Sequence, residues 1–360
     1  MSDHHRPQRD ARGQRTADRP LRNPVAPVRR GLVLGAGGVL GFAWMVGALQ
    51  ALQDEEGFDP LDAEVVVGTS SGSILAALLA CGVGVDALRR HQQGIPLPAD
   101  PAIDWNYDAD SGGALPPWPG VGVGSRDLLC RVARNPRRLP PLAVLSALAP
   151  PGRGTLDPVG RMITAVAAIG GLTERWPSRP QTWIVAMDYS AGDRVAFGRD
   201  GAPPAALPDA VMASCSIPGW YAPVALDGHR YVDGGACSPA SLDLLAGHGL
   251  DEVWVLAPTV SFAYDRPRSP VARLERRVRR SFSRRLLIEA AAVRETGTAV
   301  TVLAPGPEDL QSIGGNMMNP RRRTAVLETS LRTSASALRR RVDAAPGTPR
   351  HVASAGTTAS

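Results

Sequence analysis

The sequence predicts an α/β protein in which helices cover a mainly parallel sheet, because two consecutive segments repeat one plan. Each segment begins with a short aliphatic run, continues through a glycine-containing break and ends in an apolar stretch of helical character. Segment 31–52 reads GLVLGAGGVLGFAWMVGALQAL, and segment 63–82 reads AEVVVGTSSGSILAALLACG. Right-handed crossovers would bring both breaks to the carboxyl edge of the sheet, where α/β proteins bind ligands.

Within the first segment we expect a strand over 32–34, a glycine loop and a helix over 41–52. Within the second we expect a strand over 63–67, a sharp turn and a helix over 71–80. Residues 94–125 are rich in Pro, Gly, Asp and Trp, which predicts a long loop, and long loops in compact domains are often lids.

The remaining elements continue the alternation of strands and helices. They are helical segments 126–150 and 156–170, a β-hairpin over 182–198 around Ala191-Gly192, a helix over 207–215, a strand over 253–257, a basic helix over 271–296, a strand over 299–303 and a last helix over 320–341. We therefore predict one folded domain over 30–342, flanked by disordered tails at 1–29, which is basic, and 343–360.

Composition excludes several classes of protein. All 40 basic residues are arginine, so the chain has no lysine with which a P-loop could reach phosphates. The four cysteines are dispersed and form no CxxC pair, so we predict neither a zinc site nor a disulfide framework, and no metal or cofactor.

Residues 31–53 and 65–85 carry no charge, but glycines and hydroxyl residues interrupt them, so we expect no membrane span. We expect a cytoplasmic protein.

The turn in the second segment fits the pattern G-x-S-x-G, with Gly68 and Gly72 flanking Ser70. In a nucleophile elbow, a strand ends in a strained turn and a helix begins at once, which exposes the serine hydroxyl. The glycines remove side chains where strand and helix approach each other. Ser70 is therefore a candidate nucleophile. The alternative is an ordinary strand–helix turn in which Ser70 or Ser71 caps the helix.

The glycine loop of the first segment contains Gly35, Gly37, Gly38 and Gly41. A dinucleotide-binding fingerprint would need its third glycine at the position of Leu40, one residue earlier than it occurs. An oxyanion hole is the better interpretation, because the backbone N–H groups of Gly37 and Gly38 could converge on one point beside Ser70.

A nucleophilic serine needs a base. Among the six histidines, His229 and His248 are the plausible partners, which would complete a Ser-His-Asp triad. The other candidate is Asp233, since Gly234 and Gly235 allow a tight loop with backbone donors around its carboxylate. A plain Asp-Gly turn without catalytic role is the remaining interpretation.

Taken together, these motifs resemble the patatin-like phospholipase family. The resemblance runs from about Gly31 to Asp233 and, more weakly, to about Leu331. It is carried by blocks in family order: GAGGVLG (35–41), GTSSG (68–72), ASCSIPGWYAPV (213–224) and DGG (233–235). It implies a three-layer α/β/α fold, hydrolysis of lipid acyl esters, a Ser70–Asp233 dyad and oxyanion donors at Gly37 and Gly38.

Two positions depart from the family pattern. Leu40 stands where relatives often carry Arg or Lys, and Ala36 stands where they carry glycine. Both changes keep the backbone donors, but they do not indicate which head group the substrate carries. A triad esterase and a catalytically silent lipid-binding protein are the alternative functions.

A basic segment, 266–285, alternates arginines with apolar residues at helical spacing. Such a helix could contact an anionic membrane surface or present a solvated face. Nucleic-acid binding is not indicated, because stacking aromatics are not interleaved with the arginines. In the long loop, Trp105, Tyr107 and Trp118 could gate an acyl-chain channel or could simply pack on the surface.

Overall fold

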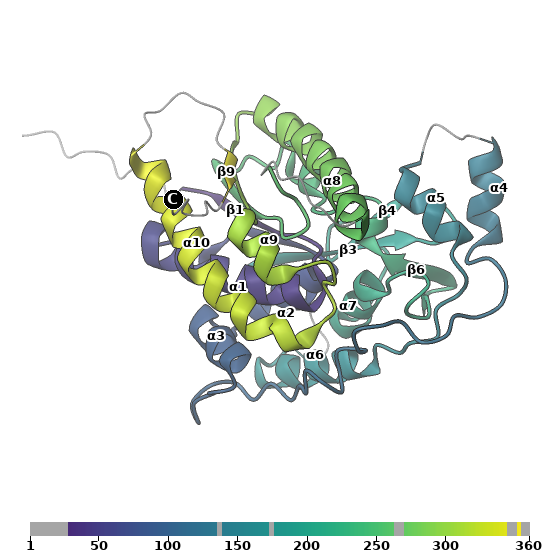
Figure 1. The fold of residues 1–360 in the computed structure, drawn as a ribbon, viewed down its shortest axis with the longest axis horizontal. Coiled ribbons are helices and arrows are strands. Elements are labelled where there is room, and N and C mark those ends of the chain that lie inside the picture. The colour runs from purple at the N-terminus through teal and green to yellow at the C-terminus, as the bar shows by residue number, and fades with distance from the viewer. Residues whose placement is uncertain (1–27, 135–138, 173–175, 263–269, 344–350, 354–360) are drawn as a thin grey trace, which may run out of the picture.

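The computed structural model describes residues 28–134, 139–172, 176–262, 270–343 and 351–353 (Figure 1). Most of the two predicted tails lies outside these residues. Helices pack on both faces of one central sheet, so the predicted three-layer α/β/α architecture is confirmed.

Within the described residues the sheet has nine strands in the order β5-β6-β3-β2-β1-β7-β8-β9, and β4 also pairs with β3. The strands parallel to one another along this order are β1 (Arg30–Leu34), β2 (Val65–Thr69), β3 (Gln181–Asp188), β7 (Glu252–Leu256), β8 (Ala299–Ala304) and β9 (His351–Ala353). Antiparallel pairing joins β4 (Arg194–Phe197) and β6 (His229–Asp233) to β3, and β5 (Val224–Leu226) to β6. The sheet is therefore mainly parallel, as predicted.

Alternating side chains of β1 divide the core. Leu32 and Leu34 point into the larger cluster, and Val33 points into the cluster on the opposite face. The larger cluster is covered by α1 (Gly38–Glu56), α2 (Ser71–Ala80), α3 (Val85–Gln93), α6 (Asp157–Ile169), α7 (Leu207–Cys215) and α10 (Arg323–Asp343). The opposite face is covered by α8 (Pro270–Glu295) and the 3₁₀ helix η3 (Leu242–Leu245).

Three further α-helices lie among the described residues. α4 (Arg126–Arg134) and α5 (Pro141–Leu148) share a small separate cluster beside β3 and β6, and they lie at one side of the molecule in Figure 1. α9 (Pro307–Ile313) packs beside α10. Among the described helices, none combines the length and the apolar character that a membrane crossing requires.

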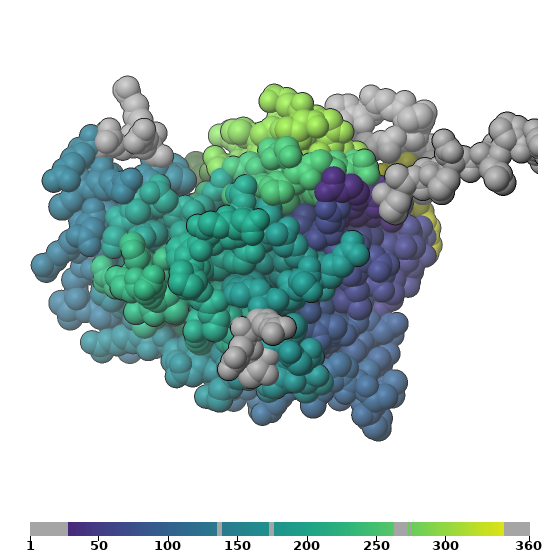
Figure 2. Space-filling model, turned by 180° about the vertical axis from the view of Figure 1, so that it is seen from behind, coloured from purple at the N-terminus to yellow at the C-terminus, as the bar shows by residue number. Residues whose placement is uncertain are grey.

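The first and last long helices pack closely, and Figures 1 and 2 show the N-terminal and C-terminal colours side by side. The Ser330 hydroxyl donates to the carbonyl of Trp44 at 2.7 Å. A Cβ on Gly47 would lie 2.8 Å from the Cβ of Ser330, so glycine is what allows the two helices this approach.

Most predicted elements are present, with three differences. The first helix begins at Gly38 rather than at residue 41, directly after a shorter glycine loop. α3 and α9 were not predicted as elements of the fold. The short strands β5, β6 and β9 were not predicted either, since three to five residues carry too little periodicity. β9 lies within the segment 343–360, which was predicted to be a disordered tail.

The turn between β2 and α2 depends on Gly72. A Cβ at this position would lie 2.0 Å from the carbonyl oxygen of Leu34 at the end of β1. No rotamer change relieves such a contact, because the backbone fixes the position of a Cβ and the Leu34 oxygen is itself a backbone atom. The close approach of α2 to β1 therefore requires glycine.

We expect the substitution Gly72→Ala to lower the free energy of unfolding by about 3 kcal/mol or more, because an added methyl group overpacks the helix against the strand. Gly315→Ala is the matched control, since its Cβ would meet no atom within 4 Å, and its effect should stay below about 1 kcal/mol. Chemical denaturation measures both. Equal stability of the two variants would contradict the packing argument.

Candidate active site

Strand β3 brings Ser70 and Asp233 to the same level of the sheet from opposite sides. Thr69 at the end of β2 pairs with Val185, and Asp233 at the end of β6 pairs with Ala186, the next residue of β3. Ser70 follows Thr69 directly. Ser70 and Asp233, which are 163 positions apart in the chain, therefore lie on either side of β3.

Ser70 has the backbone of a strained elbow, with φ 55° and ψ −127°. Positive φ is costly for a residue with a side chain and is typical of functional turns. Gly68 and Gly72 both sit where a Cβ would collide with the backbone of the adjoining helix or strand. The strand, the turn and the helix of the predicted elbow are all present.

Hydrogen bonds to the C-terminal end of α7 hold the backbone of both Ser70 and Asp233. The Ser70 N–H donates to the Ser214 hydroxyl at 2.9 Å, and that hydroxyl donates to the carbonyl of Val185 at 2.6 Å. The Asp233 N–H donates to the carbonyl of Ser216 at 2.9 Å. Sequence reasoning missed these positioning roles, although it singled out the ASCSIPGWYAPV block that contains both serines.

Asp233 is a buried carboxylate with few compensating contacts. Desolvation raises its pKa to about 6, against the opposing effects of a hydrogen bond from the Ser70 side chain and of the Gly235 N–H. The Gly235 N–H donates to Asp233 Oδ1 at 2.7 Å. A Cβ on Gly234 would lie 2.4 Å from the carbonyl oxygen of Val185, so this glycine keeps the loop against β3.

The glycine loop approaches the same point from β1. Its first residues are tied down, since the Gly35 N–H donates to Leu256 O at 2.9 Å and the Ala36 N–H donates to Pro239 O at 2.8 Å. The Ala36 side chain would lie 3.3 Å from a Cβ on Gly235, so this loop and the Asp233 loop are in contact. Gly41 packs against Pro258, where a Cβ would lie 3.1 Å away.

The N–H groups of Gly37, Gly38 and Val39 have no acceptor among the described residues. Gly38 has φ 58°, and both Gly38 and Val39 line the same cavity as Ser70. Gly37 does not line the cavity, and a Cβ on it would lie 2.6 Å from the Pro258 ring. Of the two predicted donors, only Gly38 therefore lies at the cavity.

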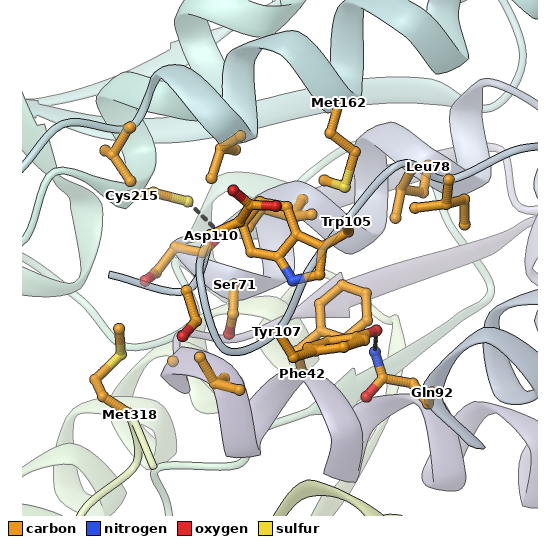
Figure 3. Close-up of a pocket in the computed structure, with 18 of the residues that line it drawn as sticks. Phe42, Ser71, Leu78, Gln92, Trp105, Tyr107, Asp110, Met162, Cys215 and Met318 are labelled. Carbon is orange, nitrogen blue, oxygen red and sulfur yellow. Dashed lines mark hydrogen bonds between the residues drawn. The ribbon is translucent and has the colours of Figure 1, made fainter. Parts of the chain in front are cut away.

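The cavity has a volume of about 800 Å³, part of it open to solvent. Its walls are mostly apolar, and Ile74 and Leu78 extend them along α2, one and two turns beyond Ser70. Figure 3 shows Trp105, Tyr107 and Phe42 together inside it, with Cys215 and Ser71 on one side and Leu78 and Gln92 on the other. The predicted long loop thus contributes one wall through Trp105 and Tyr107, whereas Trp118, the third aromatic residue named for this role, does not line the cavity.

A hydrogen-bond network holds this loop to α3. His91 Nε2 donates to the carbonyl of Ile103 at 3.0 Å, because a carbonyl oxygen can only accept, and Nδ1 lies 2.9 Å from the Tyr107 hydroxyl. Gln92 Nε2 donates to the same hydroxyl. The Arg323 guanidinium lies 3.8 Å from the centre of the Tyr107 ring. The sequence analysis did not single out His91 and missed this role.

Neither candidate triad histidine lines the cavity. His229 Nδ1 lies 2.9 Å from Asp188 Oδ2 near the start of β6, and most of its side chain is exposed. His248 packs edge-on against Trp183, near the amino ends of the strands and thus opposite the Ser70 turn. Burial and nearby Arg199 and Arg29 lower its pKa.

The four cysteines form no disulfide. Cys215 lines the cavity and donates to the Ser70 carbonyl at 3.3 Å, and burial raises the pKa of its thiol, which keeps it protonated. In the part of the chain that the structure describes, no three His, Cys, Asp or Glu side chains come together as metal ligands would.

A family model described as patatin-like phospholipase matches residues 32–246. No curated protein matches the chain. The solved structures that match include the type III effector protein ExoU, with 21% identity over 88% of this chain and a TM-score of 0.36. VipD from Legionella pneumophila has 14% identity over 87% of this chain and 67% of its own, with a TM-score of 0.41.

ExoU in its complex with SpcU, from the type III secretion system of Pseudomonas aeruginosa, has 20% identity over 74% of this chain and 52% of its own, with a TM-score of 0.31. The chain covers 54% of the length of ExoU in the first of these structures, or about half.

We expect Asp233→Asn to be more stable than the parent protein at neutral pH. A carboxyl whose pKa is raised on folding stabilises the fold fully below its unfolded pKa, 3.8, and loses that contribution as pH rises through its folded pKa, about 6. The variant's advantage should therefore be absent near pH 4 and reach about 3 kcal/mol above pH 7. Denaturant titrations at both pH values measure it, and an advantage that does not change with pH would contradict it.

Proposed function

The chain belongs to the patatin-like phospholipase family, whose members are lipid-ester hydrolases, and on that premise we propose that it cleaves lipid acyl esters through a covalent intermediate on Ser70. The observation that carries the proposal is the strained Ser70 turn, which opens into an apolar cavity beside a buried carboxylate.

In the proposed first step, Asp233 accepts the Ser70 proton while the hydroxyl oxygen attacks the ester carbonyl. The collapse of the tetrahedral intermediate expels the alcohol, which takes the proton from Asp233. In the second step, Asp233 removes a proton from water, the resulting hydroxide attacks the acyl-enzyme, and Ser70 regains its proton as the fatty acid leaves.

Burial suits Asp233 to this role. A carboxylate with an ordinary pKa is a weak base for a serine hydroxyl, whereas a pKa of about 6 leaves it ionised at neutral pH and more basic. The Gly235 N–H donates to one of its oxygens, which orients the carboxylate.

The Gly38 and Val39 N–H groups are the proposed oxyanion donors, with Gly37 as a further candidate. They lack other acceptors among the described residues and stand at the start of α1, where the helix dipole favours negative charge. Donors that are already oriented need no reorganisation when charge develops on the substrate oxygen.

The cavity supports an acyl chain as the group that is transferred. Beyond Ser70 its walls are aliphatic and aromatic, so burial of a hydrocarbon chain is favourable there by about 0.8 kcal/mol for each methylene group. Ser71 and Ser111 line the cavity with buried hydroxyls that have no partner among the described residues, and these could receive the polar part of the ester.

Ser70→Ala and Asp233→Asn should each lower kcat/KM on a soluble fatty-acyl ester by at least about 10³-fold, because each removes a group that forms or breaks a bond in both steps. A fluorophosphonate probe should label the parent protein and not Ser70→Ala. Hydrolysis and labelling together separate an enzyme from a silent lipid-binding protein, which would show neither.

His229→Ala and His248→Ala serve as controls and should keep nearly normal turnover. Loss of activity in either histidine variant would favour the triad alternative over the dyad.

The rate should also depend on one ionisation near pH 6. Because the base acts in its ionised form, kcat/KM should rise as pH passes through about 6 and fall about tenfold for each unit below that value. Stopped-flow hydrolysis of a substrate without ionisable groups measures the profile. A profile that is flat between pH 5 and 8 would exclude Asp233 as the base.

A further inference from the structure

The second half of the long loop and α5 carry an unusual group of exposed apolar side chains. Trp118 is 90% exposed, Val121 is 98% exposed and Leu115 is 77% exposed. The other members of the group are Val123, Leu145 and Leu148. Clustered exposed apolar side chains usually mark a binding surface.

Hydrogen bonds join the two segments into one surface. The N–H groups of Gly124 and Ser125 donate to the carbonyl of Ala147 at 3.0 and 3.2 Å, and the Gly120 N–H donates to the carbonyl of Pro151 at 2.7 Å. We call residues 115–123 with Leu145 and Leu148 the apolar rim. In Figure 1 the loop runs along the lower edge of the molecule toward α4 and α5.

The apolar rim adjoins the candidate active site. Ser111, four residues before the rim begins, lines the cavity, and its carbonyl accepts a hydrogen bond from the Tyr221 hydroxyl at 3.2 Å. The Asn316 side chain donates to the carbonyl of Ala114 at 2.8 Å, close in sequence to Met318 of the cavity wall. One stretch of chain therefore passes from cavity wall to exposed rim.

The charge around the rim is positive. Residues 111–153 contain six arginines and a single acidic residue, Asp127. Arg126, Arg134 and Arg153 are exposed, and none has an ion pair with another described residue. Arginine attracts anionic head groups, and tryptophan favours the boundary between water and lipid.

We propose that the apolar rim docks on an anionic phospholipid surface, with Trp118 and Val121 inserted among the lipids and the arginines on the head groups. The inference rests on the proposed function, since a lipid hydrolase draws its substrate from such a surface. Docking there would bring the cavity next to the lipid and let an acyl chain pass into it without crossing water.

The binding test uses the full chain with the substitution Ser70→Ala, so that the protein does not hydrolyse the lipids of the vesicles. Its cosedimentation with phosphatidylcholine vesicles that contain phosphatidylglycerol is compared with and without the added pair Trp118→Ser and Val121→Ser. We expect the pair to weaken binding at least about tenfold, because two inserted apolar side chains are lost. Vesicles of phosphatidylcholine alone should also bind more weakly than the anionic ones.

Ile169→Ser is the matched control, because Ile169 is a 62% exposed residue at the end of α6, outside the rim, and it should not change binding. With Ser70 intact, the paired variant should keep the parent's kcat/KM on a soluble ester while losing activity on vesicles. This soluble-ester assay tests the proposed function separately from the docking.

Three results would overturn the inference: unchanged vesicle binding in the paired variant, binding that does not depend on phosphatidylglycerol, or an equal loss in Ile169→Ser. Loss of binding on Arg277→Gln with Arg284→Gln, together with normal binding of the paired variant, would assign the docking to α8 instead. Both of those arginines are exposed on α8, within the basic segment 266–285.

Discussion

The Ser214 hydroxyl joins the two halves of the candidate site. It accepts a hydrogen bond from the Ser70 N–H and donates one to the carbonyl of Val185, so α7 holds the β2 turn against β3. Two residues later, the Ser216 carbonyl holds the Asp233 N–H. Each of these contacts holds a backbone group, so the positions of the proposed nucleophile and base follow from the register of the sheet, from one helix end and from the Ser214 side chain.

The site opposes the stability of the fold in several ways. Ser70 holds a positive φ, the carboxyl group of Asp233 is buried, and the N–H groups of Gly38 and Val39 have no acceptor in the part of the chain that the structure describes. Each feature costs free energy that the rest of the core must offset. The compensation is visible nearby, where close contacts at Gly72 pack α2 directly against β1. Buried polar groups that lack partners in the free protein remain available to stabilise the charge that develops in a transition state.

The long loop, residues 94–125, connects the cavity wall with the exposed surface of the protein. Its first half forms a wall of the cavity and is held by His91, Gln92 and Arg323, while its second half carries the exposed residues of the apolar rim. A pocket that binds a hydrocarbon chain needs walls that exclude water. A lipid that enters such a pocket also needs a path into it from the lipid surface. One segment without regular secondary structure supplies both, because it is free of the constraints that a strand or helix imposes.

The sequence alone determined the layered α/β class, the strand–turn–helix around Ser70 and most element boundaries, because aliphatic runs, helical periodicity and glycines act locally. It also singled out Asp233 as a candidate base, through a motif rather than through distance. Only the tertiary structure decided that Ser70 and Asp233 lie on either side of β3, that His91 fastens a loop at the cavity wall, and that Gly38 rather than Gly37 reaches the cavity. These facts depend on strand order, on the register of short strands and on contacts between residues far apart in the chain, none of which leaves a periodic trace in the residues themselves.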